Sequence, residues 1–395
     1  MIKFNTGKKI VVRFAVLDGV YWGIMGSFGA YLVTWVLDRG FSQSFVSLLL
    51  AIYFVSGFAG QLVLSSLCDR LRTNKNVFLF GITAAGAAQL GMYFSDSQLW
   101  FTLCYAGYGF FLGPMGSILD AWMIRSFQED MNTYSPARGV GSMGYAVVVL
   151  LMGQLVGRFG YYLMPLCSTA MVMLTLLLAV TTPDAAPDKT AKGKKAASLK
   201  EGLSILRIPA FSVILLVLFL TSMSSAPVNN FKIMLLQAAG GDITTQGLDS
   251  FLGCTVQFLV FEFAALFMNI PAKARLHISV MLVATAILLN LAATQYWLVI
   301  AGTMLLSISY GLIMPAVREI AIQIVRPQYH TTAIGVMDAF YGFLGGATAQ
   351  IFAGRIAQSH GIKALVMTCL VLSMLPLAVL WIEKGNSGRK CRKSA

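Results

Sequence analysis

The chain has 395 residues, of which 57% are hydrophobic and only 11% are charged, whereas a soluble domain has about 25% charged residues. Apolar stretches recur from Val11 to Ile382 without a long polar domain between them, which excludes a soluble enzyme carrying one membrane anchor. The net charge of +13 does not indicate a nucleic-acid partner, because Lys and Arg collect in short segments between the apolar stretches. The composition predicts a polytopic membrane protein that is not an enzyme.

Since about 20 apolar residues cross a bilayer as one helix, the chain divides into two sets of six predicted helices. In chain order they cover residues 11–37, 46–67, 76–94, 98–125, 135–157 and 160–181, then 209–238, 247–270, 276–293, 296–325, 331–358 and 362–382. We therefore predict an N-terminal six-helix bundle (1–181), a cytoplasmic linker (182–208), a C-terminal six-helix bundle (209–383) and a basic tail (384–395).

The basic residues predict the topology. They precede the first predicted helix, follow every second one and fill the linker, whereas segments such as SDSQ (95–98) and AATQ (292–295) carry none. Positive loops stay on the cytoplasmic side. We therefore expect both termini in the cytoplasm of a cell whose inner membrane holds the protein.

A weak internal repeat relates the two halves. Tyr108-Gly109 in the fourth predicted helix matches Tyr310-Gly311 in the tenth, and VGSMG (140–144) is similar to IGVMD (334–338). Six helices, a basic linker, six more helices and a repeat between the halves form the major facilitator arrangement, an all-α membrane fold of two pseudo-symmetric six-helix bundles. This arrangement implies transport of a small molecule by alternating access. We expect a monomer surrounded by lipid.

Cysteine usage suggests neither a metal site nor a disulfide framework. The six cysteines are scattered singly, without Cys-x-x-Cys or Cys/His spacing. We expect no metal and no cofactor.

Ionisable residues within the predicted helices are candidate functional residues, because each costs a few kcal/mol to insert. Asp18 lies in the first helix, where pairing with Arg13 and a proton-carrying role are equally open. Glu262 lies near the middle of the eighth predicted helix without a basic residue nearby in sequence. A lone acid at that depth should have a raised pKa, which makes Glu262 the leading candidate for a proton carrier.

Asp120 and Arg138 lie nine residues on either side of Glu129. If the chain turns there, both lie roughly 13 Å from the turn and face each other across a helical hairpin. Ser135-Pro136 offers the alternative, because an N-cap followed by proline would leave Arg138 in the first turn of its helix, free to reach the interface. The residues alone leave the two interpretations equally open.

Two further charge groups are candidates for structural or gating roles. Lys232 in the seventh predicted helix and Asp338 in the eleventh could form a mutual salt bridge. Asp69 and Arg70, in the loop after the second helix, could belong to an ordinary basic loop or to a charge latch that breaks when the halves rock.

The chain resembles the lactose permease branch of the major facilitator superfamily, the oligosaccharide:proton symporters. IMGSFGAYLVTWVL in the first helix and CDRLRTNK after the second are similar to family segments, although Arg72 stands where a glycine often follows. The strongest match is Asp120-Ala121 followed, eighteen residues after the acid, by RGVGSMGY (138–145). The resemblance implies that Arg138 donates to substrate hydroxyls, Asp120 orients Arg138 or accepts from substrate, Tyr145 stacks on a ring and Glu262 contacts substrate.

The second half departs from the family. An apolar or small residue near Ala286 replaces its arginine, and Ser307 and Tyr310 stand roughly where the family carries a histidine and its proton-carrying glutamate. We therefore expect Glu262 or Asp18 to couple transport to protons. The predicted function is proton-coupled symport of a sugar, an oligosaccharide or a related polyhydroxylated solute. The alternatives are a nucleoside or aromatic-acid permease and, with less support, multidrug efflux.

Overall fold

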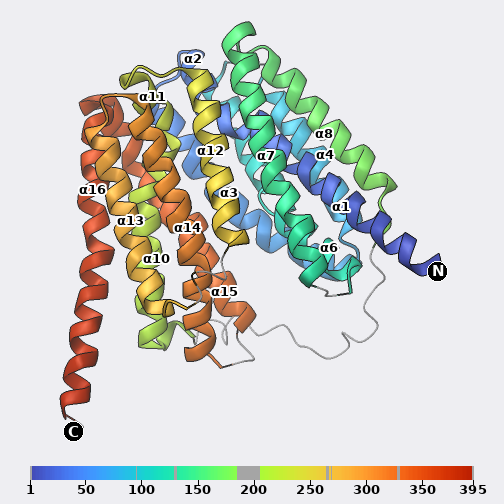
Figure 1. The fold of residues 1–395 in the computed structure, drawn as a ribbon. Helices are drawn as coiled ribbons and strands as arrows, with labels where there is room; N and C mark the ends of the chain where they lie inside the picture. Colours follow the sequence, from blue (N-terminus) through green and yellow to red (C-terminus); the bar gives the residue numbers. More distant parts are fainter. Residues whose placement is uncertain are drawn as a thin grey trace. The chain divides into compact units, whose positions relative to one another are not determined.

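The computed structural model describes residues 2–94, 96–128, 131–184, 205–263, 267, 269–326 and 330–393, with the side chains of 2–8, 69, 131–132, 135, 330–332 and 383–393 outside the description. Its elements are helical throughout the described ranges (Figure 1). They are α1 (Ile2–Ser27), η1 (Gly29–Tyr31), α2 (Leu32–Asp38), α3 (Gln43–Leu71), α4 (Lys75–Gly91), α5 (Gln98–Leu112), α6 (Met115–Ser126), α7 (Met131–Phe159), α8 (Leu163–Thr181), η2 (Ile205–Arg207), α10 (Pro209–Asn230), α11 (Lys232–Ala238), α12 (Ile243–Glu262), α13 (Ala272–Ala292), α14 (Tyr296–Ile324), α15 (His330–Asp338), η5 (Ala339–Gly345) and α16 (Gly346–Lys393).

These elements confirm the predicted all-α membrane fold with twelve helices. Within the described ranges, eight helical stretches are long and apolar enough to cross a membrane. The stretch Ala333–Ile382 holds two predicted helices, which Gly361 separates with a φ of +81°. Other crossings are broken into two elements, as at Gly113 and Pro114, between α5 and α6. Proline has no N–H to donate, so a break there is expected.

The chain divides into two compact units. Unit 1 comprises Met1–Lys192 with Asp242–Phe258, and unit 2 comprises Gly193–Gly241 with Leu259–Ala395. In unit 1, α1 packs along α7 and α8, while α5 packs against α3 and α4 (Figure 1). The N-terminal part of α12 belongs to unit 1, where Gln246 donates to the carbonyl of Ala30 at 2.8 Å. The boundaries predicted from sequence remain a prediction.

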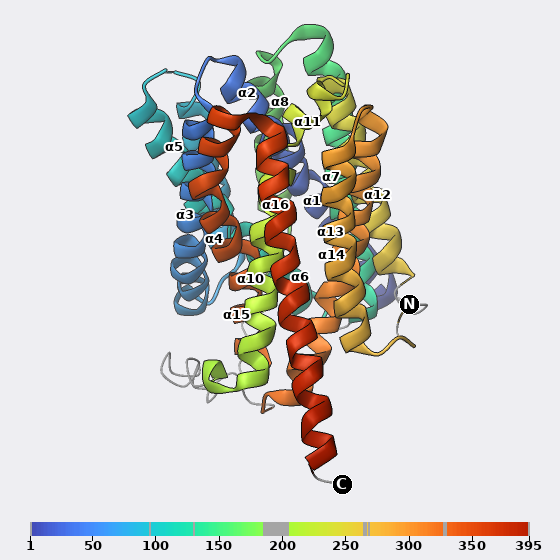
Figure 2. The ribbon, with the colours of Figure 1, turned by 90° about the vertical axis from the view of Figure 1, so that its left-hand side faces the viewer.

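In unit 2, α13 runs along α14, and α10 runs along α16 (Figure 2). A reciprocal pair of buried serines joins α13 to α14. The Ser279 hydroxyl donates to the carbonyl of Ser309 at 2.8 Å, and the Ser309 hydroxyl donates to the carbonyl of Ser279 at 3.0 Å. At the same interface Arg275 forms an ion pair with Glu319. Because lipid offers no hydrogen bonds, polar contacts between helices satisfy these groups internally.

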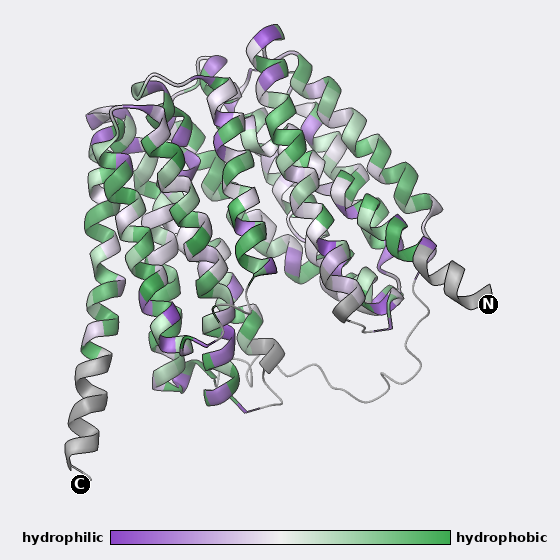
Figure 3. Ribbon diagram, in the orientation of Figure 1, coloured by the Kyte–Doolittle hydropathy of each residue, from purple (hydrophilic) through white to green (hydrophobic). Residues whose placement is uncertain are grey.

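The outer surfaces of the bundles are apolar. α8 is hydrophobic along most of its length (Figure 3), and Leu166, Met173 and Leu177 on it are exposed. Large exposed apolar residues would be an aggregation liability in water. In a bilayer they are the surface that faces the lipid tails.

Glycines allow equivalent helices to approach closely in both units, which supports the internal repeat. A Cβ on Gly109 of α5 would lie 2.5 Å from Ser56 Oγ and 2.9 Å from the carbonyl oxygen of Tyr53, both on α3. A Cβ on Gly311 of α14 would lie 2.5 Å from Val260 Cγ1 on α12. The matched Tyr-Gly pairs therefore mark the same kind of contact in each half.

Two predicted helices have other bounds in the structure. α7 begins at Met131, so Pro136 lies inside it and Ser135 is not its N-cap. Pro136 has no N–H to donate to the carbonyl four residues earlier. It therefore removes one backbone hydrogen bond near the start of α7, next to the first turn, whose amides have no intrahelical acceptor. α12 covers Ile243–Glu262 rather than 247–270. Glu262 is therefore the last residue of α12 and not near its middle, as the sequence suggested.

The close approach of α5 and α3 predicts different outcomes for two neighbouring glycines. Gly109→Ala should lower the apparent melting temperature in detergent, because overpacking against backbone costs about 1–3 kcal/mol. Gly107→Ala is the matched control, since a Cβ there lies 3.5 Å from Ala88 Cβ, an ordinary contact. The control should melt at or above the parent temperature, because alanine favours a helix by roughly 0.5–1 kcal/mol over glycine. Equal melting temperatures for the two variants would contradict the close contact.

Candidate substrate-binding site

Arg138 of α7 is the centre of a cluster of charges in unit 1. Its Nε atom lies 3.0 Å from Asp120 Oδ1 on α6. Its Nη1 atom donates to Asp18 Oδ2 on α1 at 3.4 Å. The predicted Asp120–Arg138 pair across the helical hairpin is therefore confirmed as a contact, and the alternative, in which Arg138 reaches for the interface from a first helical turn, is wrong.

Asp18 joins this cluster, which the sequence did not predict. Its side chain is 1% exposed, whereas that of Arg138 is 27% exposed. Arg13, the partner considered from sequence, is exposed. Among the described residues the cation that contacts Asp18 is Arg138, because α1 and α7 pack along each other and bring residues 120 positions apart together.

A tryptophan and a glycine fix the position of the cluster. The guanidinium carbon of Arg138 lies 4.8 Å from the centre of the Trp22 ring, a cation–π distance. Gly141, about one turn after Arg138 on α7, leaves room for both α1 side chains. A Cβ on Gly141 would lie 2.0 Å from Asp18 Oδ2 and 2.7 Å from Trp22 Cδ1. The glycine in RGVGSMGY therefore serves helix packing beside the charges.

Tyr134 completes the surroundings of Asp120. It precedes Arg138 by one helical turn on α7, and its hydroxyl donates a hydrogen bond to the Asp120 carboxylate. Side chains at positions i and i+4 lie on one face of a helix. Tyr134 was missed because Ser135-Pro136 suggested that the helix begins after it.

The charges of the cluster do not balance if both acids are ionised. Among the described residues, two carboxylates, Asp18 and Asp120, contact one guanidinium. An uncompensated charge in a protein interior is costly and favours taking up a proton. The arrangement can therefore hold one exchangeable proton and present hydrogen-bond donors and acceptors to a ligand at the partly exposed side of Arg138.

Tyr145 lies two helical turns after Arg138, near Cys254 and Asp249 of α12. Asp249 is fully buried. With a predicted helix start at 247, Asp249 falls in the first turn, where an acid is common. The observed helix begins at Ile243, which moves Asp249 into its second turn.

Glu262 differs from its prediction in burial as well as position. Its side chain is exposed at the end of α12. The expectation of a buried, lone acid at mid-depth is therefore wrong. The acid of α12 that is buried is Asp249.

The expected partners of Asp338 also change. The Asp338 carboxylate lies 3.6 Å from Arg318 of α14, a cation that was not among its expected partners, and its pairing with Lys232 remains a prediction. Lys232 is buried at the start of α11. Arg318 lies within the tenth predicted helix, and no sequence motif links it to Asp338.

The loop after α3 makes contacts within unit 1. Arg70 is exposed, and the side chain of Asp69 lies outside the described residues. Arg72 ends α3 with a φ of +54°, a left-handed conformation that glycine adopts most readily. Lys75 donates to the carbonyls of Val180 and Thr182 at the end of α8, each at 2.7 Å, as a cation at a helix C-terminus does. The latch role of Asp69 and Arg70 remains a prediction.

Removing the central cation should destabilise the protein. Arg138→Leu leaves two acids without their cation, and breaking a fully buried pair costs about 3–5 kcal/mol. We expect a smaller loss because Arg138 is partly exposed, read as a lower apparent melting temperature in detergent. Adding Asp18→Asn should recover part of that loss.

Arg158→Leu is the matched control, since Arg158 is exposed in the last turn of the same helix. It should melt like the parent protein. If the effects of Arg138→Leu and Asp18→Asn simply add, the two residues do not interact.

Comparisons with known proteins agree with this architecture. The model of the "MFS_1 like family" matches residues 13–368. An "Uncharacterized transporter YwbF" of Bacillus subtilis (strain 168) is 22% identical over 330 residues, which are 82% of this chain and 80% of that protein. A "Maltose permease" of Geobacillus stearothermophilus is 22% identical over 276 residues, 69% of each chain.

Solved structures show the same fold. The nucleoside transporter NupG aligns with a TM-score of 0.81 at 13% identity, over 94% of this chain and 98% of that chain. A bacterial homologue of the human lysosomal transporter Spinster aligns with a TM-score of 0.72 at 13% identity, over 95% and 96% of the two chains. Twelve helices in the major facilitator arrangement and a family match over most of the sequence lead to one conclusion: the chain belongs to the MFS_1-like family of transporters, within the major facilitator superfamily.

Proposed function

We propose that this transporter is a proton-coupled symporter of a sugar, an oligosaccharide or a related polyhydroxylated solute. The observation that carries the proposal is the cluster in which Arg138 contacts both Asp120 and Asp18. Ionisable residues within a membrane bundle mark substrate and proton pathways. The similarity to a maltose permease supports the substrate class.

The chemistry of the cluster favours a neutral, hydroxyl-rich substrate. A sugar hydroxyl can accept from the Arg138 guanidinium and donate to Asp120, while Tyr145 supplies an aromatic face. With one acid protonated, the single cation is already paired with the other carboxylate, so an organic anion would add a negative charge that nothing in the cluster compensates. The cluster therefore disfavours aromatic or other organic acids.

A nucleoside is the second candidate. It is also neutral and carries ribose hydroxyls, and its base can stack on an aromatic ring. The fold match to a nucleoside transporter supports including nucleosides among the substrates tested. Efflux of drugs has less support, because apolar cavities that accept many ligands do not require a charge cluster.

We assign the exchangeable proton to Asp18 in preference to Glu262. Asp18 is almost fully buried against Arg138, whereas Glu262 is exposed at the end of α12. A substrate that hydrogen-bonds Arg138 and Asp120 changes the electrostatic potential at Asp18. Binding of the substrate and binding of the proton are therefore coupled. Rocking of the two six-helix halves would then carry substrate and proton together. In this proposal both termini are cytoplasmic, and Asp69 and Arg70 form the charge latch.

Transport by purified protein tests this assignment. Proteoliposomes under an imposed pH gradient should concentrate at least one member of a panel of sugars, oligosaccharides and nucleosides. Asp18→Asn should abolish uphill accumulation but keep exchange of internal for external substrate, because only the proton site is lost. Arg138→Ala and Asp120→Ala should abolish both activities, because they remove substrate contacts.

The controls distinguish the candidate acids. Glu262→Gln and Asp38→Asn, an exposed acid at the end of α2, should retain accumulation. Loss of accumulation in Glu262→Gln together with its retention in Asp18→Asn would assign the proton to Glu262 instead. Uptake unaffected by Arg138→Ala and Asp120→Ala would overturn the substrate site.

A further inference from the structure

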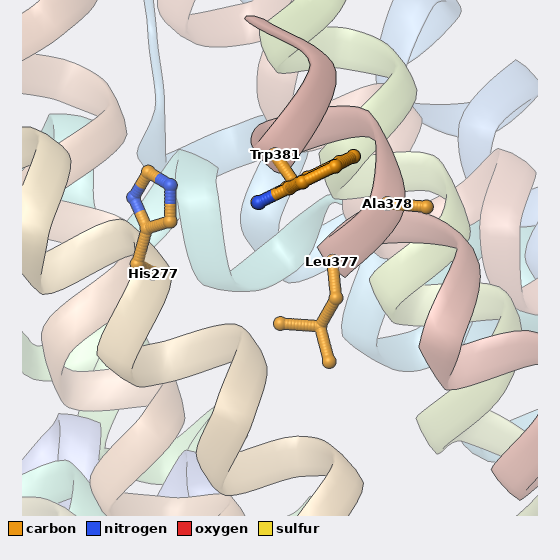
Figure 4. A pocket seen from close by; sticks show the side chains of 4 residues that line it. All are labelled: His277, Leu377, Ala378 and Trp381. Carbon is orange, nitrogen blue, oxygen red and sulfur yellow. The ribbon is translucent and has the colours of Figure 1, made fainter. Parts of the chain in front are cut away.

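A cavity of about 400 Å³ lies in unit 2 and is separate from the charge cluster. Its lining consists of His277 on α13 and of Leu377, Ala378 and Trp381 on α16 (Figure 4). The Trp381 side chain, 77% exposed, points its indole nitrogen toward the His277 ring (Figure 4). One end of the cavity is therefore polar, and the aliphatic part of its lining is Leu377 and Ala378.

His277 offers a polar atom to a ligand in this cavity. Its Nδ1 atom lies 2.6 Å from the carbonyl oxygen of Lys273, so Nδ1 carries the hydrogen that this contact requires. Nε2 is buried, and none of the described residues forms a hydrogen bond with it. A buried polar atom without a partner needs an explanation, and a ligand in the cavity supplies one.

The position of the cavity matches the boundary between lipid tails and headgroups. His277 lies in the second turn of α13, and Trp381 lies at the end of the apolar stretch Ala333–Ile382. Tryptophan concentrates at such interfaces. One turn further into the apolar stretch, Met281 and Met374 are exposed on the same faces as His277 and Ala378. They extend the apolar surface in the direction that an acyl chain would follow.

Basic residues that neighbour the cavity lining in the sequence favour an anionic ligand. Lys273 is exposed one turn before His277. The sequence directly after Trp381 and Ile382 carries five basic residues and one acid, Glu383, up to residue 393. Basic residues next to a membrane helix attract anionic lipids by about 1 kcal/mol each.

We propose that this cavity binds an anionic phospholipid, with the phosphate at His277 and Trp381 and an acyl chain along Leu377 and Met374. The indole N–H and Lys273 supply hydrogen-bond donors for the phosphate oxygens. With its hydrogen on Nδ1, His277 presents Nε2 as an acceptor to a hydroxyl of the lipid headgroup. The apolar lining provides the contact that free phosphate lacks. The site is independent of the transported substrate.

Native mass spectrometry of the full chain, loaded with equal amounts of phosphatidylglycerol and phosphatidylcholine, tests the site. The parent protein should retain phosphatidylglycerol in excess. Trp381→Leu should lower that retention about tenfold, the effect of losing one hydrogen bond to a charged group. His277→Leu should lower it by a smaller factor, because the hydrogen bond it loses is to a neutral hydroxyl. Lys273→Gln should lower it less, since its charge acts from the exposed surface.

His360→Leu and Trp297→Leu are matched controls, because both side chains are exposed elsewhere in unit 2. They should retain phosphatidylglycerol like the parent protein, and excess glycerol phosphate should not displace the lipid. Equal retention of the two lipids by the parent would overturn the proposal. An equal loss of phosphatidylglycerol in the control variants and the site variants would also overturn it. Displacement of the lipid by glycerol phosphate would overturn it too, because it would indicate a site for free phosphate.

Discussion

A guanidinium inside a membrane bundle requires carboxylates within reach, and this requirement organises unit 1. Arg138 meets Asp120 from α6 and Asp18 from α1, with Trp22 against its face. Three separate helices must therefore converge at one depth. Two features of the helices help to place Asp120 and Arg138 there. α6 begins after the break that follows α5, and α7 begins before Pro136.

The cluster also depends on close packing of α1 against α7. Gly141 leaves space for Asp18 and Trp22, and a Cβ on Gly144 would lie 2.3 Å from the carbonyl oxygen of Gly19. In membranes, small residues bring helices together because hydrophobic association is weak there. The glycines that allow α1 and α7 to touch thus also bring the buried Asp18 within reach of Arg138.

The sequence predicts the number and placement of the crossings well, because a span needs about 20 apolar residues. It offers the contact of Asp120 with Arg138 as one of two equally open interpretations, since the two residues lie at equal distances from Glu129 in the sequence. It could not predict that Asp18 would join them, because the rotation of α1 depends on contacts with residues more than a hundred positions away. Errors of about one turn at helix starts hid Tyr134 and Asp249. A larger error at the end of α12, which was predicted at 270 and lies at Glu262, made Glu262 look buried when it is exposed.

We propose that one carboxyl beside Arg138 holds a proton that substrate binding perturbs. Infrared difference spectroscopy of the purified protein, with and without a substrate found by the transport assay, measures it directly. A protonated carboxyl has a C=O stretching band that a carboxylate lacks. We expect a substrate-induced change in this band that disappears in Asp18→Asn and persists in Glu262→Gln. A band change that persists in Asp18→Asn and disappears in Glu262→Gln would contradict it.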